Sequence, residues 1–284
     1  MKFILGTATF GNSYGVANER LNFKYQDLEN LLIVAQELGI QTIDTAPAYG
    51  PAEKVVGRFH SDNRKFAVHT KVSSRPNLST SDVVNSIDQS ILDLYVEKID
   101  VLYFHSADFL INESQETVRQ LLKAIKGTGL VSRIGASVYT EEEIKKISKL
   151  WKEIEVFQVP ENIMDQRLLN SSLLPKLASS GIAIHVRSIF LQGLLLMENS
   201  KIPQNLLSSK SYLLELQNYA NELQMSVLDV CINYLSKLTW ASEFLIGATA
   251  PSQLADIINY QQADLMEAPL PKPLPIELID PRRW

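Results

Sequence analysis

The stretch KIDVLYFH, residues 98–105, is a β-rich apolar run with a polar residue at each end. Short runs of this kind are typical of buried strands. Seven more occur along the chain: KFILG from residue 2, QTID from 41, KFAVHTK from 65, VSRIGAS from 131, IEVFQVP from 154, IAIHVRS from 182 and SEFLIGA from 242. The sequence therefore predicts eight strands.

Helical patterns fill the gaps between these runs. From residue 25 to 35 apolar side chains recur every three or four positions, which places them on one helix face, and Gly39 then ends the pattern. The same spacing recurs over residues 83–94, 118–125 and 140–151, and the longer gap at 207–238 has room for two helices. Strands that alternate with helices indicate parallel βαβ units, and eight such units close into a barrel.

We therefore predict an α/β fold, a single-domain (β/α)8 TIM barrel over residues 1–284. The barrel spans about 2–263 with no N-terminal hairpin before its first strand, and a proline-rich C-terminal tail occupies 264–284. Because prolines interrupt helices, we expect this tail to wrap the surface or to contact a neighbouring subunit. The alternative is an open doubly wound sheet, but no G-x-G-x-x-G motif follows the first strand.

Composition excludes several functional classes. The chain has 27 Lys and Arg against 32 Asp and Glu, a net charge of −5, and its basic residues do not cluster, so we expect no nucleic-acid partner. Its single cysteine, Cys231, cannot form an internal disulfide and fits a buried helix position. No run is long enough for a membrane span or a secretory signal. We expect a cytoplasmic protein, monomeric or weakly homo-oligomeric, without a membrane partner.

Three consecutive strands end on polar residues. Asp44, Lys71 and His105 close the second, third and fourth runs, and Tyr49 follows Asp44 in the next loop. Each alone has a structural explanation: a turn residue for Asp44, a solvated strand end for Lys71, a core histidine for His105. Together they lie where barrel enzymes place catalytic groups, at the carboxyl ends of neighbouring strands.

These four side chains suit proton transfer to an oxygen. A phenol loses its proton near pH ~10, but a neighbouring ammonium favours the phenolate. A carboxylate would keep that ammonium charged and oriented, and a histidine would hydrogen-bond a substrate oxygen. The group contains no serine or cysteine nucleophile. It can donate a proton to an oxygen that is becoming negative.

These residues resemble the aldo-keto reductase family, and the resemblance runs from Gly6 to about Asn259. LGTATFGNSYGVANE resembles the family's opening strand and loop, and IDTAPAYGPAEKVVG its Asp-x-Ala-x-x-Tyr-Gly-x-x-Glu signature. HTKV and LYFH resemble the strands that carry its lysine and histidine, and RIGAS, FQVPEN, VRSIFLQGLLL and LIGATAPSQL its cofactor-side segments. The resemblance implies a barrel that binds NADP(H) in preference to NAD(H), uses no metal, and transfers hydride between nicotinamide C4 and a carbonyl carbon.

The resemblance also implies residue roles. Tyr49 would be the general acid and base, Lys71 would favour its phenolate form, Asp44 would support Lys71, and His105 would orient the carbonyl. The cofactor would be held by Gly6, Thr7, Asp44, Ser137, Gln158, Arg187, Ser188, Leu191, Gln192, Gly193, Gly247, Thr249, Gln253 and Asp256. The substrate would be lined by Phe10, Tyr14, His105, Phe109 and Phe190, and Asn12, Ser13 and Arg187 make the pocket polar enough for a sugar.

Four positions depart from the family pattern. Val138 replaces a common Asn, and Arg187 stands where an aromatic residue often stacks on the nicotinamide. Its guanidinium could stack or could reach a phosphate or a substrate acid. Thr249 replaces the Arg that commonly grips the 2′-phosphate, and Ile257 replaces an Asn.

We therefore predict an NAD(P)H-dependent oxidoreductase, an aldehyde or ketone reductase or alcohol dehydrogenase, whose partner is a small carbonyl or alcohol compound, sugar-derived ones included. One alternative is a non-catalytic NADP(H)-binding regulatory module. Another is a Schiff-base aldolase that uses Lys71 as an amine, which a charged Asp44 nearby opposes. A metal hydrolase is not expected, because His60, His69, His105 and His185 never occur at helical ligand spacing.

Overall fold

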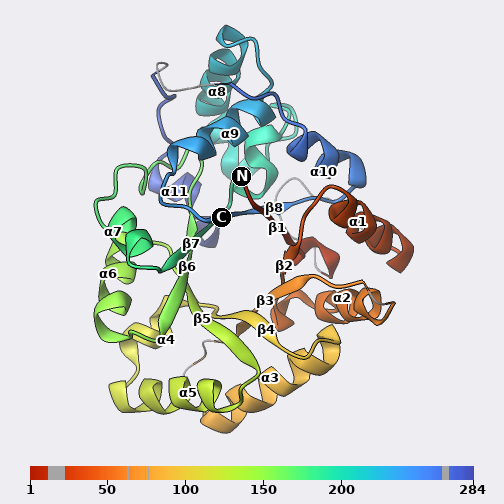
Figure 1. The fold of residues 1–284 in the computed structure, drawn as a ribbon. Helices are drawn as coiled ribbons and strands as arrows, with labels where there is room; N and C mark the ends of the chain where they lie inside the picture. The colour runs from red at the N-terminus through yellow and green to blue at the C-terminus, as the bar shows by residue number, and fades with distance from the viewer. Residues whose placement is uncertain (12–22, 63, 74, 76, 264–268) are drawn as a thin grey trace.

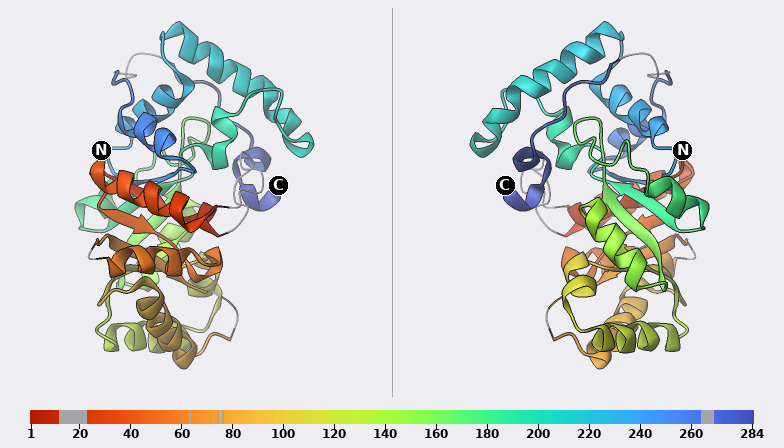
Figure 2. Two further views of the ribbon diagram at one scale, coloured as in Figure 1. Left: turned by 90° about the vertical axis from the view of Figure 1, so that its right-hand side faces the viewer. Right: turned by 90° about the vertical axis from the view of Figure 1, so that its left-hand side faces the viewer.

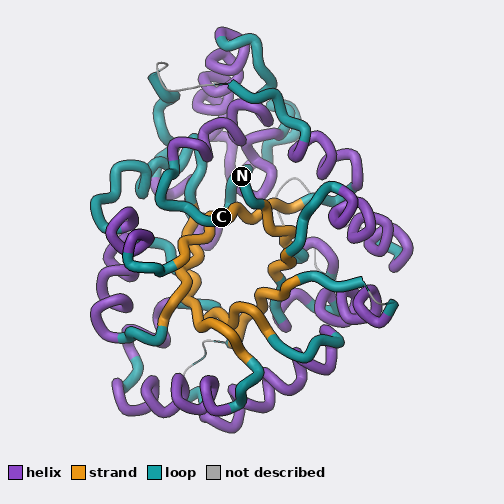
Figure 3. Tube along the Cα trace, viewed as in Figure 1, coloured by secondary structure: helices purple, strands orange, loops and turns teal. Residues whose placement is uncertain are grey.

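The structure is a computed structural model that describes residues 1–11, 23–62, 64–73, 75, 77–263 and 269–284. Its centre is a closed barrel of parallel strands in chain order, seen along its axis in Figure 1 and as the inner ring of Figure 3. The strands are β1 (Phe3–Gly6), β2 (Thr42–Asp44), β3 (Ala67–Val72), β4 (Ile99–Phe104), β5 (Val131–Ser137), β6 (Ile154–Pro160), β7 (Ala183–Arg187) and β8 (Glu243–Gly247). This confirms the predicted TIM barrel.

Helices surround the strands and bury their apolar faces against them (Figure 3). The main ones are α1 (Tyr25–Glu37), α2 (Ala52–Ser61), α3 (Thr80–Leu94), α4 (Ala107–Asn112), α5 (Gln115–Gly127), α6 (Glu141–Leu150), α7 (Leu174–Ser179), α8 (Lys210–Glu222), α9 (Val227–Tyr234) and α10 (Pro251–Ile258). α8 and α9 are the two helices expected between 207 and 238. Across the described ranges, no helix combines the length and apolarity that a bilayer crossing needs.

Local sequence signals fix several helix ends. Thr140 begins α6 with a capping box: its hydroxyl accepts from the Glu143 N–H (3.2 Å), and the Glu143 carboxylate accepts from the Thr140 N–H (2.9 Å). Cys231 is buried in α9, as predicted, and burial raises the pKa of its thiol to about 12. It is therefore a core residue rather than a reactive thiol.

The barrel interior differs from the core between barrel and helices. Its buried apolar residues, Val101, Tyr103 and Val156, form a small separate cluster. Gly135 makes room for the Tyr103 ring, because a Cβ there would lie 2.5 Å from Tyr103 Cδ1. Polar side chains fill much of the remaining interior, unlike the aliphatic layers usual in this fold.

The C-terminal tail packs against the barrel. Its described part buries Leu274 and Ile279, and the Leu274 N–H donates to the Met164 carbonyl (2.9 Å). One short helix, α11 (Ile276–Ile279), begins directly after Pro275, where a proline is tolerated. Figure 2 shows α11 at the opposite end of the barrel from the first residue of the chain.

Candidate functional site

The four predicted acid–base residues meet at the carboxyl end of the barrel. The Lys71 ammonium is ion-paired with the Asp44 carboxylate and also donates to the Thr45 carbonyl (2.9 Å). Lys71 Nζ lies 5.1 Å from the Tyr49 ring centroid, and the Tyr49 and His105 rings lie edge to face with centroids 6.1 Å apart. The parallel neighbours β2, β3 and β4 thus bring the Asp44 carboxylate, the Lys71 ammonium and the Tyr49 and His105 rings into one group.

Backbone packing fixes the position of Tyr49. It ends a 3-10 turn, Pro47–Tyr49, whose first residue is a proline, and the chain leaves through Gly50 at φ +63°. The loop after β1 presses on this turn, because a Cβ on Gly11 would lie 2.2 Å from the Tyr49 carbonyl oxygen. The Tyr49 phenol is therefore attached to a turn whose backbone is held in place by neighbouring residues.

The charges of this group follow from burial and from near neighbours. Burial alone would lower the pKa of Lys71, but the Asp44 carboxylate and the Tyr49 phenol raise it above its usual value. Burial and the Lys71 charge lower the pKa of His105 to about 4. At neutral pH the site therefore holds a charged lysine and a neutral histidine.

Gln158 is a further member of this group. Its side-chain amide donates to the second oxygen of Asp44 (2.7 Å), so both oxygens of that buried carboxylate are bound. The family resemblance placed Gln158 among the residues that hold the cofactor. That role stays a prediction, and the structure adds a contact to Asp44 that no local pattern revealed.

A cavity of about 370 Å³ opens beside Tyr49. Many residues predicted to bind cofactor or substrate line it: Gly6, Asp44, Gln158, Arg187, Ser188, Phe190, Gln192, Gly193, Gly247, Thr249, Gln253 and Asp256. Other predicted residues do not line it: Thr7, Ser137 and Leu191 are buried beside it, Phe10 and Phe109 belong to the hydrophobic core, and His105 lies against the Tyr49 ring rather than in the cavity wall. Asn12, Ser13 and Tyr14 lie outside the described residues.

Some lining residues were not expected from the sequence: Ala8, Thr9, Ile189, Leu196, Met197, Leu228, Leu245, Ile246 and Ala248. Most of them are next to a predicted residue in the sequence, and that position is the sequence signal that could have identified them. Leu228 is different, because it comes from α9 and reaches the cavity only through the packing of that helix.

The loop after β7 has an unusual backbone. Ser188, Leu191 and Gln192 adopt positive φ values of 62°, 47° and 56°, and Gly193 follows at 90°. Such values are uncommon for residues with a side chain and often occur at ligand sites. Asn162 helps to hold the loop, because its amide donates to the Ser188 carbonyl (3.0 Å).

Arg187 lies at the cavity wall with its charge unpaired. Its guanidinium lies 4.3 Å from the Tyr139 ring centroid and donates to Ser188 Oγ (3.2 Å) and to the Val138 carbonyl (3.3 Å). No carboxylate of the described residues forms an ion pair with it. The tail residue Arg282 also packs on Tyr139, with 3.5 Å from its guanidinium carbon to the ring centroid.

Comparison with known proteins identifies the same family as the sequence resemblance. The sequence profile of the Aldo/keto reductase family matches residues 2–269. This chain belongs to the aldo-keto reductase family. Among curated relatives, the NADH-specific methylglyoxal reductase of Escherichia coli K12 is 25% identical over 274 residues, covering 84% of this chain and 83% of that protein.

A second curated relative and a solved structure are also similar to this chain. The L-glyceraldehyde 3-phosphate reductase of E. coli K12 is 25% identical over 268 residues, covering 81% of this chain and 77% of that protein. The crystal structure of a Pseudomonas aeruginosa protein described as an aldo-keto reductase superposes with a TM-score of 0.66 at 21% identity, covering 90% of this chain and 87% of that one. As an aldo-keto reductase, this chain is an oxidoreductase that acts on carbonyl compounds with a nicotinamide cofactor.

Proposed function

We propose that this aldo-keto reductase reduces small aldehydes or ketones, with Tyr49 as the proton donor. One observation carries the proposal: Tyr49 lines the cavity and has a charged, buried lysine at its ring and a neutral histidine at its edge. A phenol so placed can give its proton to a carbonyl oxygen as negative charge develops there. The bound nicotinamide would supply the hydride.

The other three residues prepare that proton transfer. Lys71 stabilises the phenolate that remains on Tyr49 after the proton has left, and Asp44 holds Lys71 charged within a nearly water-free site. His105 is neutral at physiological pH, so it can donate an N–H hydrogen bond to the substrate oxygen without competing as an acid. This arrangement fixes the substrate oxygen against the phenol.

The cavity also fits a nicotinamide dinucleotide. It extends from Tyr49, over the positive-φ loop after β7, to Asp256 in α10. At the α10 end, the Thr249 N–H and hydroxyl both donate to Gln253 Oε1 (2.8 and 3.0 Å). Among the described lining residues the only cation is Arg187, the last residue of β7.

These contacts support NADH rather than NADPH as the preferred cofactor. A 2′-phosphate requires a cation, whereas the Asp256 carboxylate at that end can accept hydrogen bonds from ribose hydroxyls. This reverses the preference implied by the family resemblance. A curated relative is itself named an NADH-specific methylglyoxal reductase.

Arg187 defines the substrate class. An unpaired guanidinium on the wall that also contains Tyr49 can bind a phosphate or carboxylate on the substrate. We therefore propose a short carbonyl compound that carries an anionic group. One relative is named an L-glyceraldehyde 3-phosphate reductase, which fits this class.

A Schiff-base reaction at Lys71 has less support. An amine nucleophile must be neutral, but the Asp44 carboxylate, the Tyr49 phenol and the Thr45 carbonyl all hold the Lys71 ammonium in its charged form. A regulatory module without turnover would not need the complete proton-transfer group. The geometry therefore favours reduction over both alternatives.

The decisive experiment is the Tyr49→Phe variant, which keeps the ring and removes the proton. Oxidation of NADH is followed by its absorbance with glyceraldehyde 3-phosphate, glyceraldehyde and methylglyoxal as substrates. We expect kcat/KM to fall about 10²- to 10⁴-fold with NADH binding unchanged. Tyr95→Phe, at a tyrosine that is 59% exposed, is the matched control. Equal turnover by Tyr49→Phe and wild type would exclude the assigned role.

A further inference from the structure

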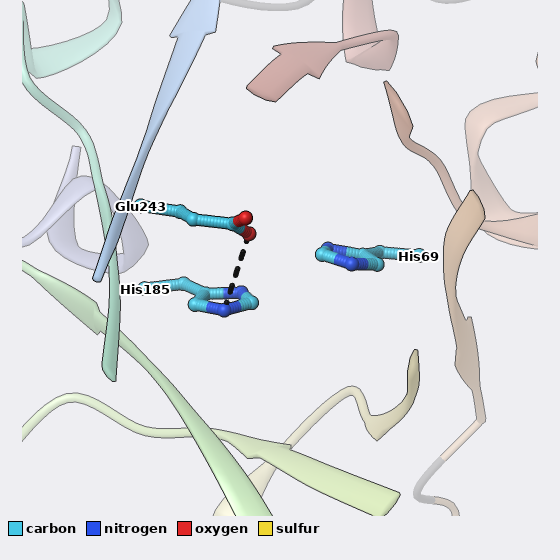
Figure 4. Close-up of side chains that lie close together, drawn as sticks. All are labelled: His69, His185 and Glu243. Atoms are coloured by element: carbon cyan, nitrogen blue, oxygen red, sulfur yellow. Dashed lines mark ion pairs between the residues drawn. The ribbon is translucent and has the colours of Figure 1, made fainter. Parts of the chain in front are cut away.

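Three side chains converge inside the barrel below the active site. His69 comes from β3, His185 from β7 and Glu243 from the first position of β8, and Figure 4 shows them pointing toward one another. One ligand atom from each lies within 4.8 Å of the other two. His69 precedes Lys71 by two residues on the same strand, which places this group about 7 Å along β3 from the lysine.

We propose that His69, His185 and Glu243 form a binding site for a divalent transition-metal ion of the zinc type. Two imidazoles and one carboxylate are a ligand set that Zn²⁺ accepts, with a fourth position left for water. This site is separate from the proton-transfer group and has no part in the proposed reduction.

The distances suit such an ion after small side-chain movements. Ligand atoms around a tetrahedral zinc ion lie roughly 3.4 Å apart, given metal–ligand distances of about 2.1 Å. His185 Nε2 and Glu243 Oε2 are already 3.3 Å apart. The remaining separations are at most 4.8 Å and need to close by about 1.4 Å or less. The two imidazole rings, now stacked at 15° with centroids 5.1 Å apart, must also turn so that both face one ion.

One ligand atom has no polar partner. His69 is 2% exposed, and its Nδ1 has no hydrogen-bond partner among the described residues, whereas Glu243 Oε2 faces His185 Nε2 at 3.3 Å. Buried polar atoms are normally satisfied, so His69 Nδ1 requires a partner that the described residues do not provide. His60 shows the contrast: it is equally buried, but its Nδ1 contacts the Leu94 carbonyl (2.8 Å) and its Nε2 accepts from the Phe66 N–H (3.2 Å).

The neighbours of the group also suit metal binding. The Tyr103 hydroxyl lies 2.6 Å from His185 Nδ1 and would fix the ring with Nε2 facing the ion. The Glu243 side chain is 20% exposed, which gives an entry path.

Arg133 opposes this site. Its positive charge lies near enough to act on His69, His185 and Glu243, and the positive charge of Lys2 also acts on Glu243. A metal ion must overcome this repulsion, which the Glu243 carboxylate offsets. The affinity for metal should therefore increase when Arg133 is neutralised.

The test uses full-length protein without a histidine tag, stripped with a chelator and titrated with Zn²⁺ by calorimetry and with Co²⁺ by visible absorption. We expect one ion per chain and the absorption bands of a four-coordinate cobalt site. His69→Leu and Glu243→Gln should each weaken binding at least about tenfold. His60→Asn should leave it unchanged, and Arg133→Met should strengthen it.

Two results would overturn the proposal: no binding of either ion by the wild type, or binding that survives both His69→Leu and Glu243→Gln. Because a buried histidine variant can fail to fold, the near-isosteric and partly exposed Glu243→Gln decides the question alone in that case. Loss of reduction in Tyr49→Phe with unchanged zinc binding would show that the two sites are independent.

Discussion

Lys71 and Asp44 form an ion pair that is almost entirely excluded from water, since each side chain is only 2% exposed. The carboxylate is bound on both oxygens, by Lys71 and by Gln158, and the ammonium is also bound by the Thr45 carbonyl. A pair of this kind contributes little net stability, but removing one partner leaves the other charge buried and unpaired. The proton transfer proposed for Tyr49 would account for its presence.

The first prediction separates the structural from the catalytic contribution of this pair. Lys71→Met leaves the Asp44 carboxylate unpaired, so we expect the free energy of unfolding to fall by about 3–5 kcal/mol. The double variant Lys71→Met/Asp44→Asn removes both charges and should regain most of that stability. Urea unfolding measures both effects.

Activity should not follow stability in the same pair of variants. Because neither variant has an ammonium near Tyr49, both should lose kcat/KM for NADH-dependent reduction by roughly 10²-fold or more. Recovery of activity together with stability in the double variant would mean that Lys71 acts only as a structural residue.

The second prediction concerns pH. Burial and the Lys71 charge lower the pKa of His105 to about 4, so the imidazole stays neutral from pH 8 down to about pH 5. We expect kcat/KM to lose nothing through His105 protonation in that range, with a loss only as the pH approaches 4. A decrease centred near pH 6.5 that disappears in His105→Asn would contradict this.

The third prediction assigns Arg187. Arg187→Met should raise KM for an anionic substrate such as glyceraldehyde 3-phosphate by about 10- to 100-fold, because a charge-assisted contact is lost. KM for uncharged glyceraldehyde should change by less than about threefold. An equal increase in KM for NADH would instead place the guanidinium at the cofactor. Arg119→Met, at an exposed arginine of α5, is the control.

Strand periodicity was enough to predict the barrel, and the polar strand ends were enough to predict that Asp44, Tyr49, Lys71 and His105 gather at one end of it. Their role in proton transfer stays a prediction. Those signals are local: the last residue of β2 and the residues near the ends of β3 and β4 must share one rim in a parallel barrel. The His69, His185 and Glu243 group was not predictable in this way, because the three residues lie on strands β3, β7 and β8 and have no recognisable ligand spacing in the sequence. Strands far apart in the chain face each other across a closed barrel, and the spacing of residues in the sequence does not show which side chains meet there.

The fourth prediction concerns Glu161, a fully buried acid directly after β6 whose side chain accepts from the Tyr234 hydroxyl (2.5 Å) and from the Leu168 N–H (2.9 Å). Burial raises the pKa of Glu161 to about 8. Since the folded value exceeds the unfolded one, the folded state holds the extra proton between about pH 4.5 and 8. Its stabilising contribution is complete below that window and is lost as the pH rises through it.

Glu161→Gln removes this titration and keeps the contacts, because the amide oxygen can accept from Leu168 and the amide nitrogen can donate to Tyr234. We expect wild type and variant to have similar free energies of unfolding at pH 5, and the variant to be more stable at pH 9 by a few kcal/mol, since each pKa unit corresponds to about 1.4 kcal/mol. Urea unfolding across this range measures the difference, with the exposed Glu142→Gln as control. A constant difference between wild type and Glu161→Gln from pH 5 to 9 would show that Glu161 is already ionised in the folded protein, held by its two donors against the cost of burial.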